Sequence, residues 1–128
     1  MANYRDRKSF GERQEYIIIA ELLKRDYDVY KPLVDDQGID CIIRRSTRKR
    51  PRYIDLQIKA LSKETKEQNA GLFAALEIRN PRENYLFVFY SERLDTKWII
   101  PSLDLKEIAS ENKKGKNAGK YTINLTRM

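Results

Sequence analysis

The sequence predicts a mixed α/β or α+β domain in which helices flank a central sheet. Two strand-like runs cover 38–43 and 53–60, and two apolar runs at 85–90 and 97–100 have the composition of buried strands. Helical spacing of apolar residues begins near Ser9 and continues to about Arg25. Strands and helices therefore occur along the whole chain, which contains no internal repeat.

The length indicates one domain. The chain has 128 residues, of which 41% are hydrophobic, 10% aromatic and 35% charged. A chain of this size can bury a core without disulfides or structural metals, and its apolar content is that of a folded protein. We expect a single domain over 1–128, with a mobile basic arm at 1–8.

Several functional classes are excluded by composition. The chain has no histidine, so imidazole catalysis and histidine-ligated zinc are excluded. The one cysteine, Cys41, lies in an apolar run and reads as a small buried hydrophobe. No apolar stretch approaches the ~20 residues of a membrane span, and no secretory signal is recognisable, so we expect a cytoplasmic protein with no membrane partner.

The charge is strongly positive and is concentrated in two segments. The net charge of +7 favours a polyanionic partner, first of all nucleic acid. The arginine-rich connector contains Arg44, Arg45, Arg48, Lys49, Arg50 and Arg52, and the lysine loop contains Lys113, Lys114, Lys116 and Lys120. We expect both to contact DNA phosphates; the alternative is two solvated loops that keep the protein soluble.

The first helix is expected to begin with a capping box, Ser9-Phe10-Gly11-Glu12, in which the glutamate returns to the amide of the cap residue. Glu12 and Glu15 would then lie one turn before the buried face. That face is expected to contain Tyr16, Ile19, Ala20 and Leu23.

The remaining helices and strands are predicted from residue composition and from residues that interrupt regular structure. The segment 28–32 is expected to be the first strand, and Pro32 indicates an edge position or the end of pairing. The segment 71–78 reads equally well as strand or helix. We expect a short capped helix at 102–109, a last strand at 121–125, and charged residues gathered at one end of the sheet.

The polar residues of the central strands carry the chemistry. Alternation places Asp55, Gln57 and Lys59 on one face of the second run. Gly38 can turn the chain sharply into the first run, which carries Asp40 near its start. If the two runs pair as a hairpin, Asp40 approaches the face that carries Gln57 and Lys59.

This set of side chains is suited to phosphodiester hydrolysis. Asp40, with an acid from Glu12 or Glu15, could ligate Mg²⁺, and Gln57 could add its carbonyl oxygen. Lys59 would orient or activate the water. The alternative is a solvent-facing strand surface beside an aspartate that caps a turn.

The chain resembles the PD-(D/E)XK nuclease superfamily, in particular compact archaeal Holliday-junction resolvases and Mrr-type restriction enzymes. The resemblance lies in the order and expected elements of three motifs: Glu12, Gly38-Ile39-Asp40 and Gln57-Ile58-Lys59. The resemblance covers roughly 9–61. It implies a restriction-endonuclease-like fold, a Mg²⁺ or Mn²⁺ cofactor and three roles, with Asp40 as metal ligand, Lys59 as catalytic lysine and Glu12 as helix acid. Most of the superfamily has an acid where this chain has Gln57, a substitution that Mrr-like branches share. Glu15 is the reserve helix acid, and Asp55 is a reserve ligand.

The function expected from these features is a metal-dependent DNA endonuclease, acting on branched or duplex DNA. A catalytically inactive nucleic-acid-binding module with the same fold is the main alternative, and a protein-interaction or membrane-surface domain is a third. Because one motif set supplies one active site, cutting two strands calls for a homodimer, with an interface expected around Phe73 or Trp98.

Overall fold

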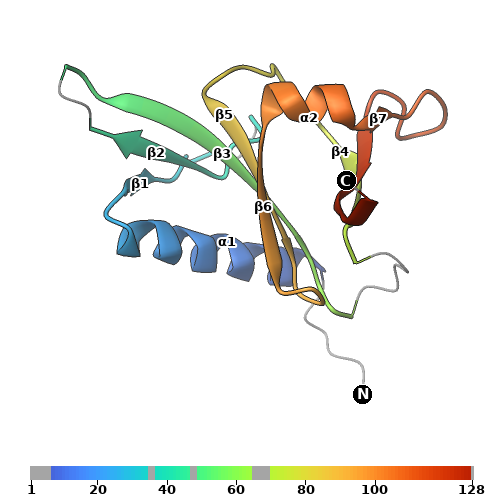
Figure 1. Cartoon of the computed structure of the whole chain (residues 1–128), viewed down its shortest axis with the longest axis horizontal. Helices are drawn as coiled ribbons and strands as arrows, with labels where there is room; N and C mark the ends of the chain where they lie inside the picture. Colours follow the sequence, from blue (N-terminus) through green and yellow to red (C-terminus); the bar gives the residue numbers. More distant parts are fainter. Residues whose placement is uncertain (1–6, 35–36, 47–48, 65–69, 128) are drawn as a thin grey trace.

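The computed structural model describes residues 7–34, 37–46, 49–64 and 70–127. Its elements, in chain order, are α1 (Arg7–Lys24), β1 (Asp28–Tyr30), β2 (Cys41–Arg45), β3 (Arg52–Leu61), β4 (Leu72–Leu76), β5 (Tyr85–Ser91), β6 (Thr96–Pro101), α2 (Ser102–Ile108), β7 (Ser110–Glu111), β8 (Tyr121–Asn124) and the 3₁₀ turn η1 (Leu125–Arg127). They form a mixed sheet flanked by helices, which confirms the expected fold class (Figure 1).

The large sheet has the strand order β1-β2-β3-β5-β6. Only the β3–β5 pair is parallel, and the other three pairs are antiparallel. The first strand lies at an edge, as Pro32 predicted, and β2 pairs with β3 as the expected hairpin. The parallel pair joins the two halves of the chain, because the chain forms β4 before it returns to the sheet as β5.

Helix α1 covers one face of this sheet (Figure 1). Ile18, 5% exposed, packs with Leu56 and Ile58 of β3. The expected buried face was wrong, since Tyr16 and Leu23 are 60% and 53% exposed. Apolar residues at 16–19 and 22–23 satisfy helical spacing on two adjacent faces, and packing on the sheet selects the face centred on Ile18.

The start of α1 also differs from the expectation. Within the described residues the helix begins at Arg7, so Ser9 lies inside it rather than at the N-cap position of the expected capping box. Arg7 and Lys8, expected in the arm, belong to the helix, and 1–6 lie outside the described residues. The helix ends near the predicted position: Asp26 adopts a left-handed conformation (φ 65°), and the Tyr27 amide donates to the carbonyl of Leu22.

The other face of the large sheet packs against α2 and a small sheet with the order β4-β8-β7 (Figure 1). Tyr85, Phe87 and Phe89 of β5 are fully buried between the layers. Phe73 of β4 is 3% exposed within this core, and Trp98 packs against it. The expectation that Phe73 contributes to a dimer surface was therefore wrong.

The ambiguous segment at 71–78 forms β4, an antiparallel partner of β8. Ala75 has a left-handed φ of 56°, and the pairing shifts register between Phe73 and Leu76. This irregularity explains why the segment lacks a clear period of two. The short strand β7 was not anticipated.

We expected the charged residues to gather at one end of the sheet, but the two basic segments lie apart. The β2–β3 hairpin and the β7–β8 loop lie at opposite ends of the molecule (Figure 1). No helix within the described residues is long and apolar enough to cross a membrane.

Candidate active site

Asp40 is fixed at the entrance to β2 by two backbone contacts with β3. Its amide donates to the carbonyl of Leu56 over 2.8 Å, and its Oδ2 accepts from the amide of Ile58 over 2.6 Å. The side chain is 8% exposed. Gly38, with a φ of 71°, supplies the sharp turn that brings the aspartate to this position.

Three of the predicted site residues come together here. Asp40 directly precedes Cys41, which pairs with Leu56, the neighbour of Gln57 on β3. Gln57 is 9% exposed. Lys59 follows two positions later, and the amide held by Asp40 belongs to the residue between them. Gln57 and Lys59 therefore share one face of β3, and the Asp40 carboxylate is bonded to the backbone between them.

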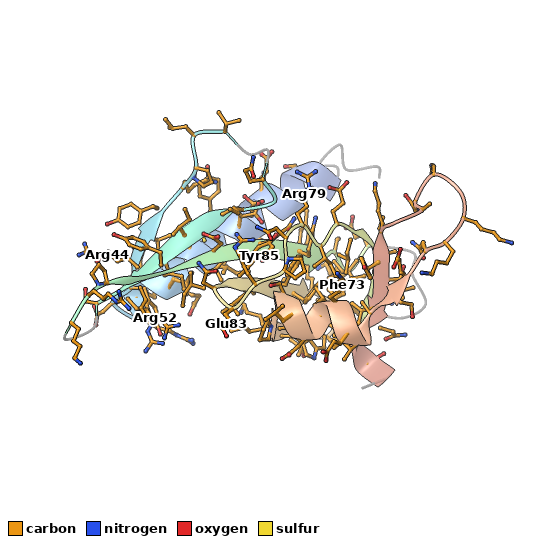
Figure 2. All side chains as sticks on the ribbon, turned by 90° about the horizontal axis from the view of Figure 1, so that it is seen from above. Arg44, Arg52, Phe73, Arg79, Glu83 and Tyr85 are labelled. Carbon is orange, nitrogen blue, oxygen red and sulfur yellow. The ribbon has the colours of Figure 1, made fainter. Side chains whose placement is uncertain are left out.

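Tyr85 is a central member of the site that the sequence did not reveal. Its hydroxyl oxygen lies 2.6 Å from the carbonyl oxygen of Gly38 and 2.8 Å from Oε1 of Gln57. Figure 2 shows Tyr85 near the middle of the molecule, away from the hairpin end marked by Arg44 and Arg52. Because Tyr85 lies in an apolar strand, the sequence predicts only that it is a core residue. The contacts of its hydroxyl depend on the position of the Gly38 carbonyl, which the sequence does not reveal.

Arg82 packs against the ring of Tyr85. Its guanidinium lies 4.5 Å from the centre of that ring and forms a short ion pair with Asp55. The buried hydroxyl of Ser102, at the start of α2, accepts from the Arg82 amide and donates to the Arg82 carbonyl, both over 2.9 Å. Asp55 is thus paired with a guanidinium, which disfavours its role as a reserve metal ligand.

Burial keeps two groups of the site in their neutral forms. It raises the pKa of the Tyr85 hydroxyl to about 12, with Asp40 and Asp55 adding to the rise. Burial likewise raises the pKa of the Cys41 thiol to about 11, followed by the effect of Asp40. Cys41 is fully buried, as predicted, and its low thiolate content argues against a nucleophilic role.

A charged cluster lies on the Lys59 side of the site. Glu77 accepts from Arg79 over 2.9 and 2.5 Å and lies 3.7 Å from the ammonium of Lys120. The hydrogen bond from Arg79 lowers the pKa of Glu77, with smaller contributions from the charges of Arg79, Lys120 and Lys59. The sequence offered no signal for this cluster, because Lys59 and Lys120 lie far along the chain from Glu77 and Arg79.

The two helix acids differ in their surroundings. Glu12 is exposed on α1. Glu15 forms an ion pair of 3.8 Å with Lys31, has a side chain only 20% exposed, and contributes to the raised pKa of Cys41, the residue after Asp40. Of the two acids, Glu15 is the one whose charge contributes to the raised pKa of Cys41.

The basic segments lie apart from this centre. Arg45 and Arg52 face each other across the hairpin and are exposed, and Arg44, opposite Tyr53, is half-buried. Lys49 and Arg50 are exposed in the same connector, and Arg48 lies outside the described residues. Lys113, Lys114 and Lys116 are exposed in the β7–β8 loop.

Comparison with solved structures finds a similar fold. One similar solved structure is a bacterial homing endonuclease, I-Ssp6803I, with a TM-score of 0.58 and 20% identity over 94% of this chain and 75% of the other. The chain shares a nuclease-like fold. No protein-family model and no curated protein sequence matches it.

The donor set bears on whether a cation fits here. Asp40 and Gln57 bring carboxylate and amide oxygens, the hard ligands that Mg²⁺ and Mn²⁺ accept. The described residues contain no group of three acidic or cysteine side chains that could hold a metal ion by themselves. The residues fit a cation that keeps part of its coordination for water and substrate oxygens, as Mg²⁺ commonly does.

Proposed function

We propose that this protein is a metal-dependent DNA endonuclease of the PD-(D/E)XK type. The observation that carries the proposal is the hydrogen bond from the Ile58 amide to Asp40, because it joins this carboxylate to β3 between Gln57 and Lys59. The likeness of the fold to a homing endonuclease supports it, as does the net charge of +7.

Each residue has a defined task in this proposal. Asp40 and Gln57 would hold Mg²⁺ or Mn²⁺, which supplies charge stabilisation at the scissile phosphate and lowers the pKa of water. Lys59 positions the attacking water or neutralises charge on the phosphate. Glu15 supplies the helix acid, and Glu12 is the second candidate for that role. Tyr85 holds the Gln57 side chain.

The basic segments supply affinity rather than chemistry. The arginine-rich connector and the lysine loop would contact DNA phosphates on either side of the site, since they lie at opposite ends of the molecule. No pattern for reading particular bases is recognisable in these segments.

The test is a cleavage panel with purified protein on duplex, four-way, flap, single-stranded DNA and RNA substrates, in Mg²⁺, Mn²⁺ or EDTA. We expect cleavage of at least one DNA substrate that requires the metal. Absence of cleavage from every substrate in both metals, with DNA binding retained, would contradict the nuclease proposal.

A second candidate is a nucleic-acid-binding module that uses the same fold without catalysis. It is favoured by the neutral Gln57 and by the absence of a three-acid metal group within the described residues. Metal titration separates the candidates, since only the nuclease requires Mg²⁺ or Mn²⁺ to bind and to raise the melting temperature.

We further propose that the chain acts as a homodimer when it cuts two strands, because one chain supplies one site. Its apolar surface includes Ile17, Leu23 and Ile99, which are 50%, 53% and 65% exposed. Sedimentation equilibrium with and without DNA tests this. A monomer in both conditions that nevertheless cuts both strands would contradict it.

A further inference from the structure

The hydroxyl of Tyr85 is in contact with two oxygens. It lies 2.6 Å from the carbonyl oxygen of Gly38 and 2.8 Å from Oε1 of Gln57. A neutral hydroxyl has one proton, so it donates to only one of them at a time. If Oε1 of Gln57 faces the hydroxyl, the oxygen that does not receive the proton lies close to the hydroxyl oxygen without a hydrogen bond.

The backbone carbonyl decides which acceptor is used. A carbonyl oxygen can only accept, whereas a glutamine amide presents either an acceptor oxygen or a donor NH₂ on a half-turn of the amide. If the hydroxyl donates to Gly38 and the Gln57 NH₂ donates to the hydroxyl oxygen, both contacts are hydrogen bonds. That arrangement leaves no close oxygen pair unsatisfied.

The half-turn determines what Gln57 presents on its other side. The amide atom of Gln57 that points away from Tyr85 has no hydrogen-bond partner within the described residues. It is not fully buried either, since Arg44 Nε is the buried side-chain atom without a partner among those residues. It is therefore reachable by water or an ion. An outward NH₂ would suit an anion, whereas an outward carbonyl oxygen suits a cation.

We propose that Tyr85 is a positioning residue that orients the Gln57 amide, so that its carbonyl oxygen faces outward beside Asp40 as a neutral ligand for a divalent cation. This rests on the proposed function for the identity of the ligand. It also gives a reason for glutamine in place of an acid, because a carboxylate has no hydrogen to donate to the hydroxyl.

The local backbone is built to keep this arrangement. Gly38 has a φ of 71°, and a Cβ there would lie 3.2 Å from the Tyr85 hydroxyl oxygen and 3.4 Å from the Gln57 amide oxygen position. The ring of Tyr85 is fully buried and is covered by the guanidinium of Arg82 at 4.5 Å. The hydroxyl therefore has little freedom to find other partners.

The orientation can be tested in the wild-type protein without metal or DNA. Nuclear magnetic resonance with ¹⁵N-labelled glutamine should show a nuclear Overhauser contact between the Gln57 side-chain NH₂ and the Tyr85 ring protons next to the hydroxyl. In Tyr85→Phe that NH₂ resonance should move upfield, because its acceptor is gone. An amide proton signal unaffected by Tyr85→Phe would overturn the proposed orientation.

The functional consequence is measured by calorimetric titration of Mn²⁺ into protein alone. Removing the hydroxyl should weaken Mn²⁺ binding by about tenfold, the lower end for partners that orient a metal ligand. Tyr90→Phe is the matched control, since Tyr90 lies on the same strand with its hydroxyl near Asp95, and its affinity should equal that of wild type. Equal affinities in Tyr85→Phe and wild type would overturn the positioning role.

The proposed role of Tyr85 and the proposed nuclease function are contradicted by different results. Wild type that cleaves DNA with Mn²⁺ while Tyr85→Phe binds Mn²⁺ equally well contradicts the role of Tyr85 and leaves the nuclease intact. Wild type that binds no Mn²⁺ contradicts the metal site itself, and with it the ligand role of Gln57.

Discussion

Asp40 accepts a hydrogen bond of 2.6 Å from the backbone amide of Ile58. The contact fixes the carboxylate against the strand that carries Gln57 and Lys59. The Asp40 carboxylate therefore has a structural role at the start of β2, whatever chemistry it also performs.

Replacing Asp40 by Asn should remove metal-dependent cleavage and the rise in melting temperature caused by Mn²⁺, because a neutral amide is a weaker ligand than a carboxylate. The metal-free protein should remain folded and lose about 1 to 2 kcal/mol, since the bond to Ile58 becomes neutral. Thermal unfolding with and without Mn²⁺ measures both effects. Asp95→Asn, at an exposed turn, serves as the control. Retention of the Mn²⁺-induced shift would make Asp40 purely structural.

Lys59→Ala should reduce the cleavage rate by about 10²- to 10⁴-fold, the range for a group acting on the reacting water or phosphate. DNA affinity should change little, because one amine contributes a small part of the total phosphate contacts. Single-turnover cleavage and a binding titration in Ca²⁺ separate the two quantities. Lys106→Ala, exposed on α2, provides the comparison. Cleavage at the wild-type rate would exclude Lys59 from the reaction.

Glu15→Gln should reduce cleavage more than Glu12→Gln, since only Glu15 influences Cys41 beside Asp40. The loss of the partly exposed Lys31 ion pair should cost less than about 1 kcal/mol, so activity and stability respond differently. Parallel rate and unfolding measurements on the two variants decide the matter. A larger loss of rate in Glu12→Gln would assign the helix acid to Glu12.

The hairpin provides a test of phosphate binding. Arg45 and Arg52 lie directly opposite each other, an arrangement that is repulsive in the free protein. Replacing both by Ala should lower the slope of log affinity against log salt by about 1.8, at ~0.9 per contact with duplex DNA. The melting temperature should stay constant or rise. A slope equal to that of wild type would place the hairpin away from the DNA.

Alkaline pH should destabilise the metal-free protein. Cys41 and Tyr85 have folded pKa values of about 11 and 12, raised from ordinary values of 9.0 and 10.0. Their protonated forms contribute stability that is complete below pH 9 and is lost as the pH rises to 12. Each group contributes on the order of 2 to 3 kcal/mol. Urea unfolding between pH 8 and 12 measures the decline, and Cys41→Ala should remove the part that begins near pH 9. A flat profile in this range would contradict the assignment.

Local patterns in the sequence were sufficient to predict most elements of this protein. Alternation in β3 and the apolar run of β5 correctly indicated strands, because each depends on contacts between near neighbours and on burial of a whole face. The same alternation placed Gln57 and Lys59 on one face, and Gly38, expected to turn the chain sharply, has a φ of 71°. The site roles inferred from these residues remain proposals.

Tertiary contacts decided the rest. Which face of α1 is buried depended on the sheet, since apolar residues occupy two adjacent faces of that helix. The contacts of Tyr85 with Gly38 and Gln57 join residues 47 and 28 positions apart, and the pairing of Asp55 with Arg82 spans 27. Spacing along the chain carries no information about such contacts, because they exist only after β5 has joined β3 in parallel.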